Sequence, residues 1–294
     1  MTHIIKKYLK ALFFCLFLLI VPFINFSTQA ATTRYPIILQ HGFFSDGTYL
    51  GKPYWDNIPQ YLNDHGHKAF TTKTIPFGEV ERIAKQMAKQ IDEVLEKTGN
   101  QKVNIVAHSF GGIVSRYLIT TLGYAPKIAS LTTISTPHRG DILANILCKG
   151  TLEGNFEIIL RALSNIFYGE EGKDIPTGAF RPITYEAMET FNKNTPNSPN
   201  VYYQSWAGIS SILGFDTGSF LPFFLYIPFG ILLSNEGRND GMVSVWSAKW
   251  GRYRGTISAN HLDQTGLDFG QSTGSFDHQG FIYDIAEELG DMGF

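Results

Sequence analysis

Three side chains in this sequence could together supply a nucleophile, a base and an acid: Ser109, His261 and Asp240. Ser109 stands in the pentapeptide Ala-His-Ser-Phe-Gly (residues 107–111), in which small residues lie two positions to either side of the serine. Small residues at these positions let a strand and a helix approach closely around a strained turn that exposes the hydroxyl. A serine becomes a strong nucleophile when a histidine takes its proton and an acid orients that histidine. The pattern therefore indicates acyl-transfer chemistry.

The residues around Ser109 predict a strand that is followed directly by a helix. Residues 103–106 are Val-Asn-Ile-Val, which is typical of a strand buried on both faces. The backbone N–H of Phe110, at the start of the helix, should point toward an oxyanion formed at the serine. Beyond two glycines, apolar residues recur at helical spacing: Ile113, Val114, Tyr117, Leu118 and Leu122.

A second N–H group is needed for the same oxyanion. The apolar segment over residues 34–40 predicts a strand that runs into His41-Gly42. The loop after such a strand can supply the second donor, because a tetrahedral intermediate needs two N–H groups that converge on one oxygen. We expect this donor to be the backbone N–H of Phe43.

The acid and the base are assigned from chain order and context. Asp240 lies in the turn-forming tripeptide Asn-Asp-Gly, and His261 lies in Asn-His-Leu-Asp after a short extended run. The order serine, acid, histidine accompanies this type of serine turn. His278 is the other histidine after Asp240, but it lies in a polar turn near the last predicted helix. The sequence therefore favours Ser109, Asp240 and His261.

The remaining segments alternate between strands and helices. An amphipathic helix is predicted over residues 79–97, ending at Gly99, and strands over residues 128–137 and 201–208. This alternation is typical of an α/β fold with a mostly parallel central sheet flanked by helices. A single domain over residues 31–294 fits the length and the lack of internal repeats.

Two stretches interrupt the alternation. Residues 141–164 are helical and apolar in patches, and loop-like residues follow, so we predict a lid over about residues 141–180. An ordinary packed helix pair is the alternative. Residues 209–234 include Pro222 and Pro228 and lack periodicity. This favours an apolar loop that contacts lipid or lines an acyl-chain cleft, with a core strand as the alternative.

The first 30 residues differ from the rest of the chain. Lysines at positions 6, 7 and 10 precede an apolar stretch over residues 11–26, and small residues follow at 27–30. This arrangement predicts a secretory signal peptide over residues 1–30 rather than an uncleaved anchor. We therefore expect a secreted protein, extracellular or periplasmic.

Charge and cysteine content narrow the function classes further. The formal net charge is −2 for the whole chain and −5 without the first 30 residues, because that stretch contains three lysines and no acidic residue. A mildly acidic surface gives no electrostatic reason to expect nucleic-acid binding. Cys148 is the one cysteine beyond the predicted signal peptide, so we expect no internal disulfide.

Four motifs in order resemble the bacterial true lipases of family I, the Pseudomonas, Burkholderia and Proteus type, over nearly the whole mature chain. They are His-Gly-Phe (41–43), Ala-His-Ser-Phe-Gly-Gly (107–112), Asn-Asp-Gly (239–241) and Asn-His-Leu-Asp (260–263). The resemblance implies an α/β-hydrolase fold with a mobile lid that cleaves triacylglycerols and other carboxylic esters at a lipid–water interface. It departs from the family at Ala107, where a glycine is usual.

The resemblance also implies a structural calcium ion beside the catalytic histidine. The matching carboxylates are Asp263 and, less closely aligned, Asp216, with backbone carbonyls near Leu267 and Gln271 completing the site. Oxygen ligands alone suit calcium. No organic cofactor is expected, and a dedicated folding chaperone is a candidate partner.

Three activities remain open from the sequence. A lipase or carboxylesterase is the leading interpretation. A phospholipase or an acyl-thioesterase could use the same triad, because the serine turn determines acyl transfer but not the leaving group. A non-catalytic lipid-binding protein on a hydrolase scaffold is the third, against which the complete set of serine, acid and histidine argues. The oligomeric state is not encoded in these motifs.

Overall fold

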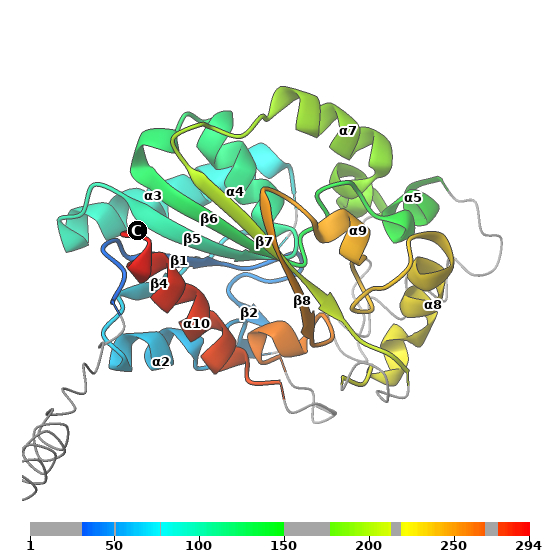
Figure 1. Ribbon diagram of the computed structural model, residues 1–294. Coiled ribbons are helices and arrows are strands. Elements are labelled where there is room, and N and C mark those ends of the chain that lie inside the picture. The colour runs from blue at the N-terminus through cyan, green and yellow to red at the C-terminus, as the bar shows by residue number, and fades with distance from the viewer. Residues whose placement is uncertain (1–30, 50, 77, 150–176, 213–218, 268–275) are drawn as a thin grey trace, which may run out of the picture. The chain divides into compact units, whose positions relative to one another are not determined.

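A six-stranded sheet forms the centre of the domain, in the order β4-β1-β5-β6-β7-β8 (Figure 1). Each neighbouring pair of strands in it is parallel. The structure is a computed structural model that describes residues 31–49, 51–76, 78–149, 177–212, 219–267 and 276–294. The sheet strands are β1 (Ile37–Gln40), β4 (Ala69–Thr71), β5 (Val103–His108), β6 (Ile128–Ile134), β7 (Tyr202–Ile209) and β8 (Arg252–Ser258).

The strand that leads to Ser109 is at the centre of this sheet. Every residue of β5 and of its neighbour β6 is buried, as expected of parallel strands covered on both faces. A separate two-stranded hairpin, β2 (Thr48–Tyr49) with β3 (Lys52–Pro53), lies in the loop after β1. Because β1, β5, β6 and β7 are parallel, their carboxyl ends lie at one edge of the sheet, where α/β folds place their sites.

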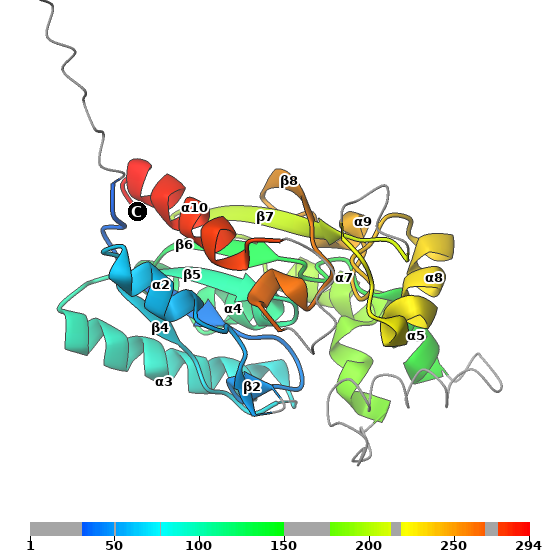
Figure 2. The same ribbon diagram turned by 90° about the horizontal axis from the view of Figure 1, so that it is seen from below.

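Helices cover both faces of the sheet. Figure 2 shows α2 (Ile58–Asp64) and α10 (His278–Asp291) on one side, and α3 (Val80–Thr98) and α4 (Gly111–Thr120) on the other. The longest of them, α3, buries one stripe, and it ends at Gly99 in the left-handed conformation, with φ 68°. Its buried stripe consists of Ile83, Ala84, Met87, Ala88 and Ile91.

Shorter helices gather beyond the carboxyl end of the sheet (Figure 1). None of the helices in the described ranges is both long enough and apolar enough to cross a bilayer. These short elements are α5 (Ile142–Lys149), α7 (Tyr185–Asn194), α8 (Tyr226–Asn235), α9 (Val245–Ala248) and the 3-10 helices Thr177–Ile183, Phe223–Leu225 and Asp263–Thr265. A further 3-10 helix, Ala125–Lys127, precedes β6.

The expected α/β architecture is confirmed, but the apolar stretch before Asp240 differs from the prediction. Instead of an irregular loop, it forms the 3-10 helix Phe223–Leu225 and then α8. Pro228 does not break α8, because it lies in the first turn, where a backbone N–H has no acceptor within the helix. The periodicity is missing because α8 is apolar on several sides: Phe229 is buried whereas Ile227 is exposed.

Several predictions fall partly or wholly outside the described residues. The predicted signal peptide lies there entirely. Of the predicted lid over residues 141–180, the described parts are α5 and the 3-10 helix Thr177–Ile183, and residues 150–176 are not described. Residues 213–218 of the predicted apolar segment are likewise not described.

Candidate active site

Ser109 occupies the turn between β5 and α4 in a strained backbone conformation. Its φ is 54°, a value that residues other than glycine seldom adopt. Two hydrogen bonds hold the turn, from the Ser109 amide to the Ile134 carbonyl (2.9 Å) and from the Thr136 hydroxyl to the Ser109 carbonyl (2.7 Å). Gly111 is required here, since a Cβ at this position would lie 2.5 Å from the His41 carbonyl oxygen.

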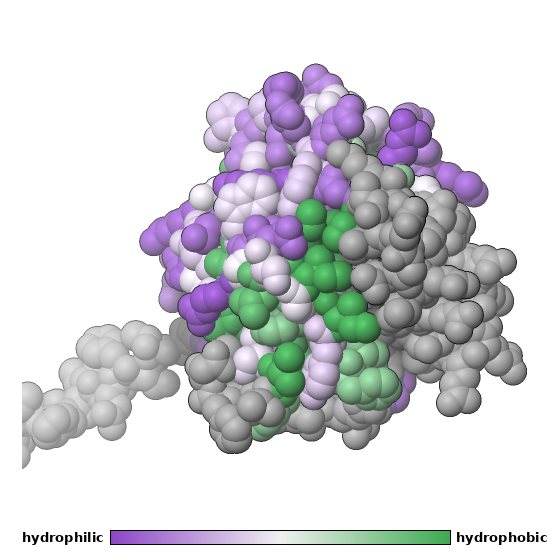
Figure 3. Space-filling view, turned by 90° about the vertical axis from the view of Figure 1, so that its right-hand side faces the viewer, coloured by the Kyte–Doolittle hydropathy of each residue, from purple (hydrophilic) through white to green (hydrophobic). Residues whose placement is uncertain are grey.

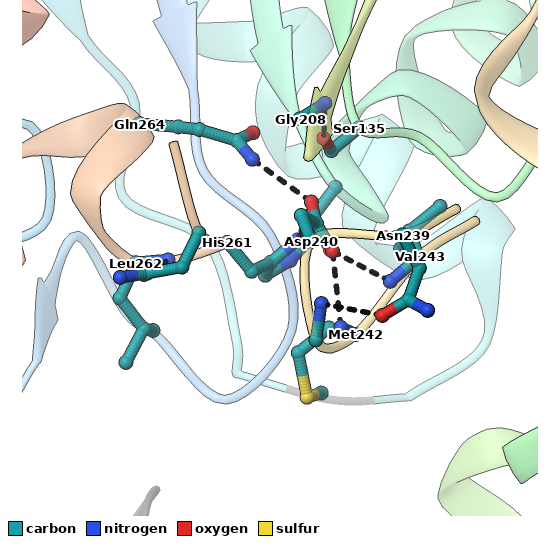
Figure 4. A network of polar contacts seen from close by, with 12 residues as sticks. Ser135, Gly208, Asn239, Asp240, Met242, Val243, His261, Leu262 and Gln264 are labelled. Carbon is teal, nitrogen blue, oxygen red and sulfur yellow. Dashed lines mark hydrogen bonds and ion pairs between the residues drawn. The ribbon is translucent and has the colours of Figure 1, made fainter. Parts of the chain in front are cut away.

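His261 and Asp240 form a buried pair. The Nδ1 atom of His261 lies 2.8 Å from Oδ2 of Asp240, and the His261 amide donates to the Asp240 carbonyl at 3.0 Å. The Asp240 side chain is completely buried, whereas that of His261 is 8% exposed. The backbone N–H groups of Met242 (3.0 Å) and Val243 (2.7 Å) donate to the other carboxylate oxygen of Asp240, and Figure 4 shows this network.

The electrostatics of Asp240 favour a carboxylate despite its burial. Burial alone would raise its pKa, but the adjacent His261 and hydrogen bonds from His261, Ser135 and Val243 outweigh burial and lower the pKa below the ordinary value. The carboxylate can therefore accept a hydrogen bond from Nδ1–H of His261, which leaves Nε2 of this ring as the atom that can take a proton.

Ser109 and His261 line the same pocket, and its walls are mostly apolar. Aromatic and aliphatic side chains from distant parts of the chain form these walls. Among them are Phe43, Phe44, Leu143, Phe180, Leu225 and Leu262. Such a pocket excludes water from an acyl group and strengthens the electrostatic interactions inside it.

The two predicted oxyanion donors lie on the loops that flank Ser109. The rings of Phe43 and Phe110 stack with centroids 3.6 Å apart and an interplanar angle of 9°. Within the described part of the chain, the amides of these two residues donate no hydrogen bond, so both remain available to a bound oxygen. The loops are close, because a Cβ on Gly42 would lie 2.8 Å from the Ser109 Cβ.

The predicted calcium ligands are described only in part. Asp263 and Leu267 follow His261 and are both buried, and a carboxylate oxygen of Asp263 accepts a hydrogen bond from the Asn260 amide at 2.6 Å. Asp216 and Gln271 lie outside the described residues. Among the residues that the structure describes, no group of three or more histidine, cysteine, aspartate or glutamate side chains could hold a metal ion.

Comparison with known proteins supports the architecture. A model of the α/β hydrolase fold family matches residues 35–156. A triacylglycerol lipase 2 of Saccharomyces cerevisiae is 33% identical over 233 residues, which are 74% of this chain and 65% of the yeast protein, so this chain spans less than two thirds of that relative. A triacylglycerol lipase of Vibrio cholerae is 27% identical over 255 residues, 79% of this chain and 80% of that protein.

A solved structure extends the likeness beyond the matched family model. The mature form of a Bacillus licheniformis lipase aligns with a TM-score of 0.63 and 22% identity, over 82% of this chain and 89% of that chain. This chain has the α/β-hydrolase fold. In the α/β-hydrolase fold, a serine after a central strand is the expected nucleophile position, and Ser109 occupies it.

Three further polar residues of this α/β-hydrolase fold, which were not predicted from the sequence, contact the predicted acid Asp240 directly or through one another. Tyr54, His108 and Gln264 are linked by hydrogen bonds and end on the Asp240 carboxylate. The sequence could have indicated Gln264, because this residue follows His261 by three positions and would share a face with it in a single helical turn. No signal in the sequence linked Tyr54 to this site.

Proposed function

We propose that the protein is a triacylglycerol lipase that hydrolyses carboxylic esters through Ser109, His261 and Asp240. The observation that carries the proposal is the joint placement of a strained serine and a histidine in one apolar pocket, with that histidine paired to a buried carboxylate at 2.8 Å. The similarity to triacylglycerol lipases supports an ester hydrolase of the lipase type.

The reaction follows from the roles of these three groups. The Ser109 hydroxyl attacks the ester carbonyl while Nε2 of His261 takes its proton. The backbone N–H groups of Phe43 and Phe110 stabilise the negative oxygen that forms. His261 then returns the proton to the leaving alcohol, and water repeats the sequence to release the fatty acid. Asp240 keeps Nδ1 protonated and stabilises the imidazolium.

Apolar surface near the pocket supports a lipid substrate. Figure 3 shows hydrophobic residues gathered on the face that carries α8. Phe223 is 67% exposed, Leu233 49% and Ile227 46%. Contiguous exposed apolar side chains mark surfaces that bind lipid or protein. We therefore propose that this face contacts the lipid–water interface and that α5 and α8 belong to a lid over the pocket.

Hydrolysis of nitrophenyl esters with short to long acyl chains, together with an emulsified triglyceride, tests this proposal. Ser109→Ala and His261→Ala should each abolish turnover without unfolding the protein. Ser115→Ala is a matched control, because this buried serine in α4 donates to the Gly111 carbonyl and to the Met87 sulfur and does not line the pocket. Near-normal turnover in Ser109→Ala would refute the triad.

The substrate series also separates the competing activities. Activity on long chains and emulsions, lost in Ser109→Ala, supports a lipase. Activity limited to short esters points to an esterase or thioesterase, and activity on phospholipids above triglycerides points to a phospholipase. A folded protein that turns over none of these substrates would support a lipid-binding role instead.

We also propose a structural calcium ion at the loop that carries His261. The described residues fit, since Asp263 offers a buried carboxylate two positions after this histidine and calcium prefers such oxygen ligands. Asp263 and the backbone carbonyl of Leu267 would help to hold the ion, which would brace the loop. Chelation by EDTA should lower the melting temperature, and the same melting curve with and without EDTA would exclude the site.

The N-terminal segment supports export of the protein. We propose that residues 1–30 direct secretion and are removed. Mass spectrometry of the exported protein should place its N-terminus near residue 31, and an intact N-terminus would contradict removal. A dedicated folding chaperone remains a candidate partner, and refolding of the pure mature chain to full activity would exclude that requirement.

A further inference from the structure

A series of buried polar groups, separate from His261, also reaches the Asp240 carboxylate. The Tyr54 hydroxyl lies 2.6 Å from Nδ1 of His108, and Nε2 of His108 lies 3.2 Å from Oε1 of Gln264. The Gln264 amide nitrogen then donates to Oδ2 of Asp240 at 2.8 Å. This is the same oxygen that His261 binds, and Figure 4 shows the approach of Gln264.

The direction of each hydrogen bond in this chain is determined by its last acceptor. A carboxylate only accepts, so the amide nitrogen of Gln264 must face Asp240 and its oxygen must face His108. Nε2 of His108 therefore carries a proton. Burial lowers the pKa of His108 well below its ordinary value, so the ring is neutral and Nδ1 accepts from the Tyr54 hydroxyl.

The residues around this series of hydrogen bonds bury it and leave space for its side chains. Gln264 and His108 are almost completely buried. Gly208, at the end of β7, leaves space for the amide, because a Cβ there would lie 2.1 Å from the Gln264 nitrogen and 2.9 Å from the Asp240 Cβ. A Cβ on Gly42 would lie 2.9 Å from the Tyr54 hydroxyl, so this series of hydrogen bonds runs from beside the predicted oxyanion loop to the acid.

We propose that Gln264 is a positioning residue, held by His108 and Tyr54, that fixes the Asp240 carboxylate and through it the orientation of His261. The inference rests on the proposed function, in which Asp240 orients the catalytic base. A neutral His108 is part of the arrangement, since its ring centroid lies 4.5 Å from that of His261. A charged ring at this distance would repel the imidazolium that forms during the reaction.

The test replaces Gln264 with methionine, which has similar length and no donor. We expect kcat on a soluble nitrophenyl ester to fall by about 10- to 100-fold, as is usual for the loss of a hydrogen bond to a buried charge, with little change in KM. The downfield proton NMR signal of Nδ1–H in His261 should shift or broaden, which a merely structural role would not cause. Gln204→Met, at a buried glutamine in β7 bonded to Thr132, is the matched control.

Further variants separate the possible outcomes. Tyr54→Phe removes the hydroxyl that lies farthest from Asp240 in this series of hydrogen bonds, and it should lower kcat by about 2- to 10-fold. In an Asp240→Ala background, Gln264→Met should change kcat less than twofold, because its effect passes through that carboxylate. Wild-type kcat and an unchanged NMR signal in folded Gln264→Met, or in folded Tyr54→Phe if the first variant does not fold, would overturn the inference. Turnover by Ser109→Ala would instead overturn the proposed function.

Discussion

His41 offers a test of how a buried neutral histidine affects stability. This residue lies between β1 and the predicted oxyanion donor Phe43 and is 2% exposed. Its Nδ1 lies 2.9 Å from the Gly42 carbonyl oxygen, and its Nε2 accepts from the Thr74 amide at 3.2 Å. The Thr74 N–H would have no acceptor if Nε2 were protonated. Burial, the largest effect, lowers the pKa of His41 from 6.5 to about 4.

The difference between the pKa of His41 in the unfolded and in the folded protein determines how this residue makes stability depend on pH. In the unfolded chain the histidine takes up a proton below about pH 6.5, whereas in the folded protein it does so only near pH 4. The stability associated with a neutral His41 is therefore fully present above pH 6.5 and is lost as the pH falls toward 4. The loss amounts to about 3 kcal/mol, since one pKa unit corresponds to about 1.4 kcal/mol.

Urea unfolding between pH 4 and 8 measures this contribution. His41→Gln removes the titrating group, so the free energy of unfolding should depend less steeply on pH below 6.5 than in the wild type. The stability difference between the two proteins should shrink by about 3 kcal/mol from pH 7 to pH 4. His65→Gln, at an exposed histidine, controls for the loss of a histidine side chain. A difference for His41→Gln that stays constant with pH would refute a neutral buried ring.

Two other substitutions test the close approach at the serine and the proposed lipid-binding face. Gly42→Ala places a Cβ 2.8 Å from the Ser109 Cβ, so kcat on a soluble ester should fall by about 100-fold. Wild-type activity of this variant would contradict the tight approach. Phe223→Asp with Ile227→Asp should reduce activity on emulsions at least tenfold more than on soluble short esters, because these exposed side chains would meet lipid. Equal losses on both substrates would argue against that role.

Local pattern predicted the elements around Ser109 well, because each depends on residues close in sequence. The β-branched run of β5 and the helical spacing of α4 both report burial directly. The order of Asp240 and His261 then sufficed to pair them, since the carboxyl ends of neighbouring parallel strands meet at one edge of the sheet. The same reasoning failed for α8, where apolar side chains on several sides erase the helical periodicity.

The residues behind Asp240 could not be predicted for a different reason. Gln264 reaches Asp240 because the 3-10 helix Asp263–Thr265 turns the chain back toward the acid, and because Gly208, near the carboxyl end of β7, leaves room for the amide. Tyr54 meets His108 across 54 residues of chain. Such contacts depend on tertiary packing, for which hydrophobic spacing carries no signal.

Two buried carboxyl groups near the pocket have pKa values shifted in opposite directions. Asp141 lines the pocket, and burial together with repulsion from Glu236 raises its pKa well above the ordinary value. Asp240 is just as buried, but its pKa is lowered because His261 and several N–H groups face it. Burial therefore does not distinguish them, whereas their partners do. The lowered pKa of Asp240 keeps its carboxylate available to accept from Nδ1–H of His261, whereas the raised pKa of Asp141 disfavours a second negative charge in the pocket.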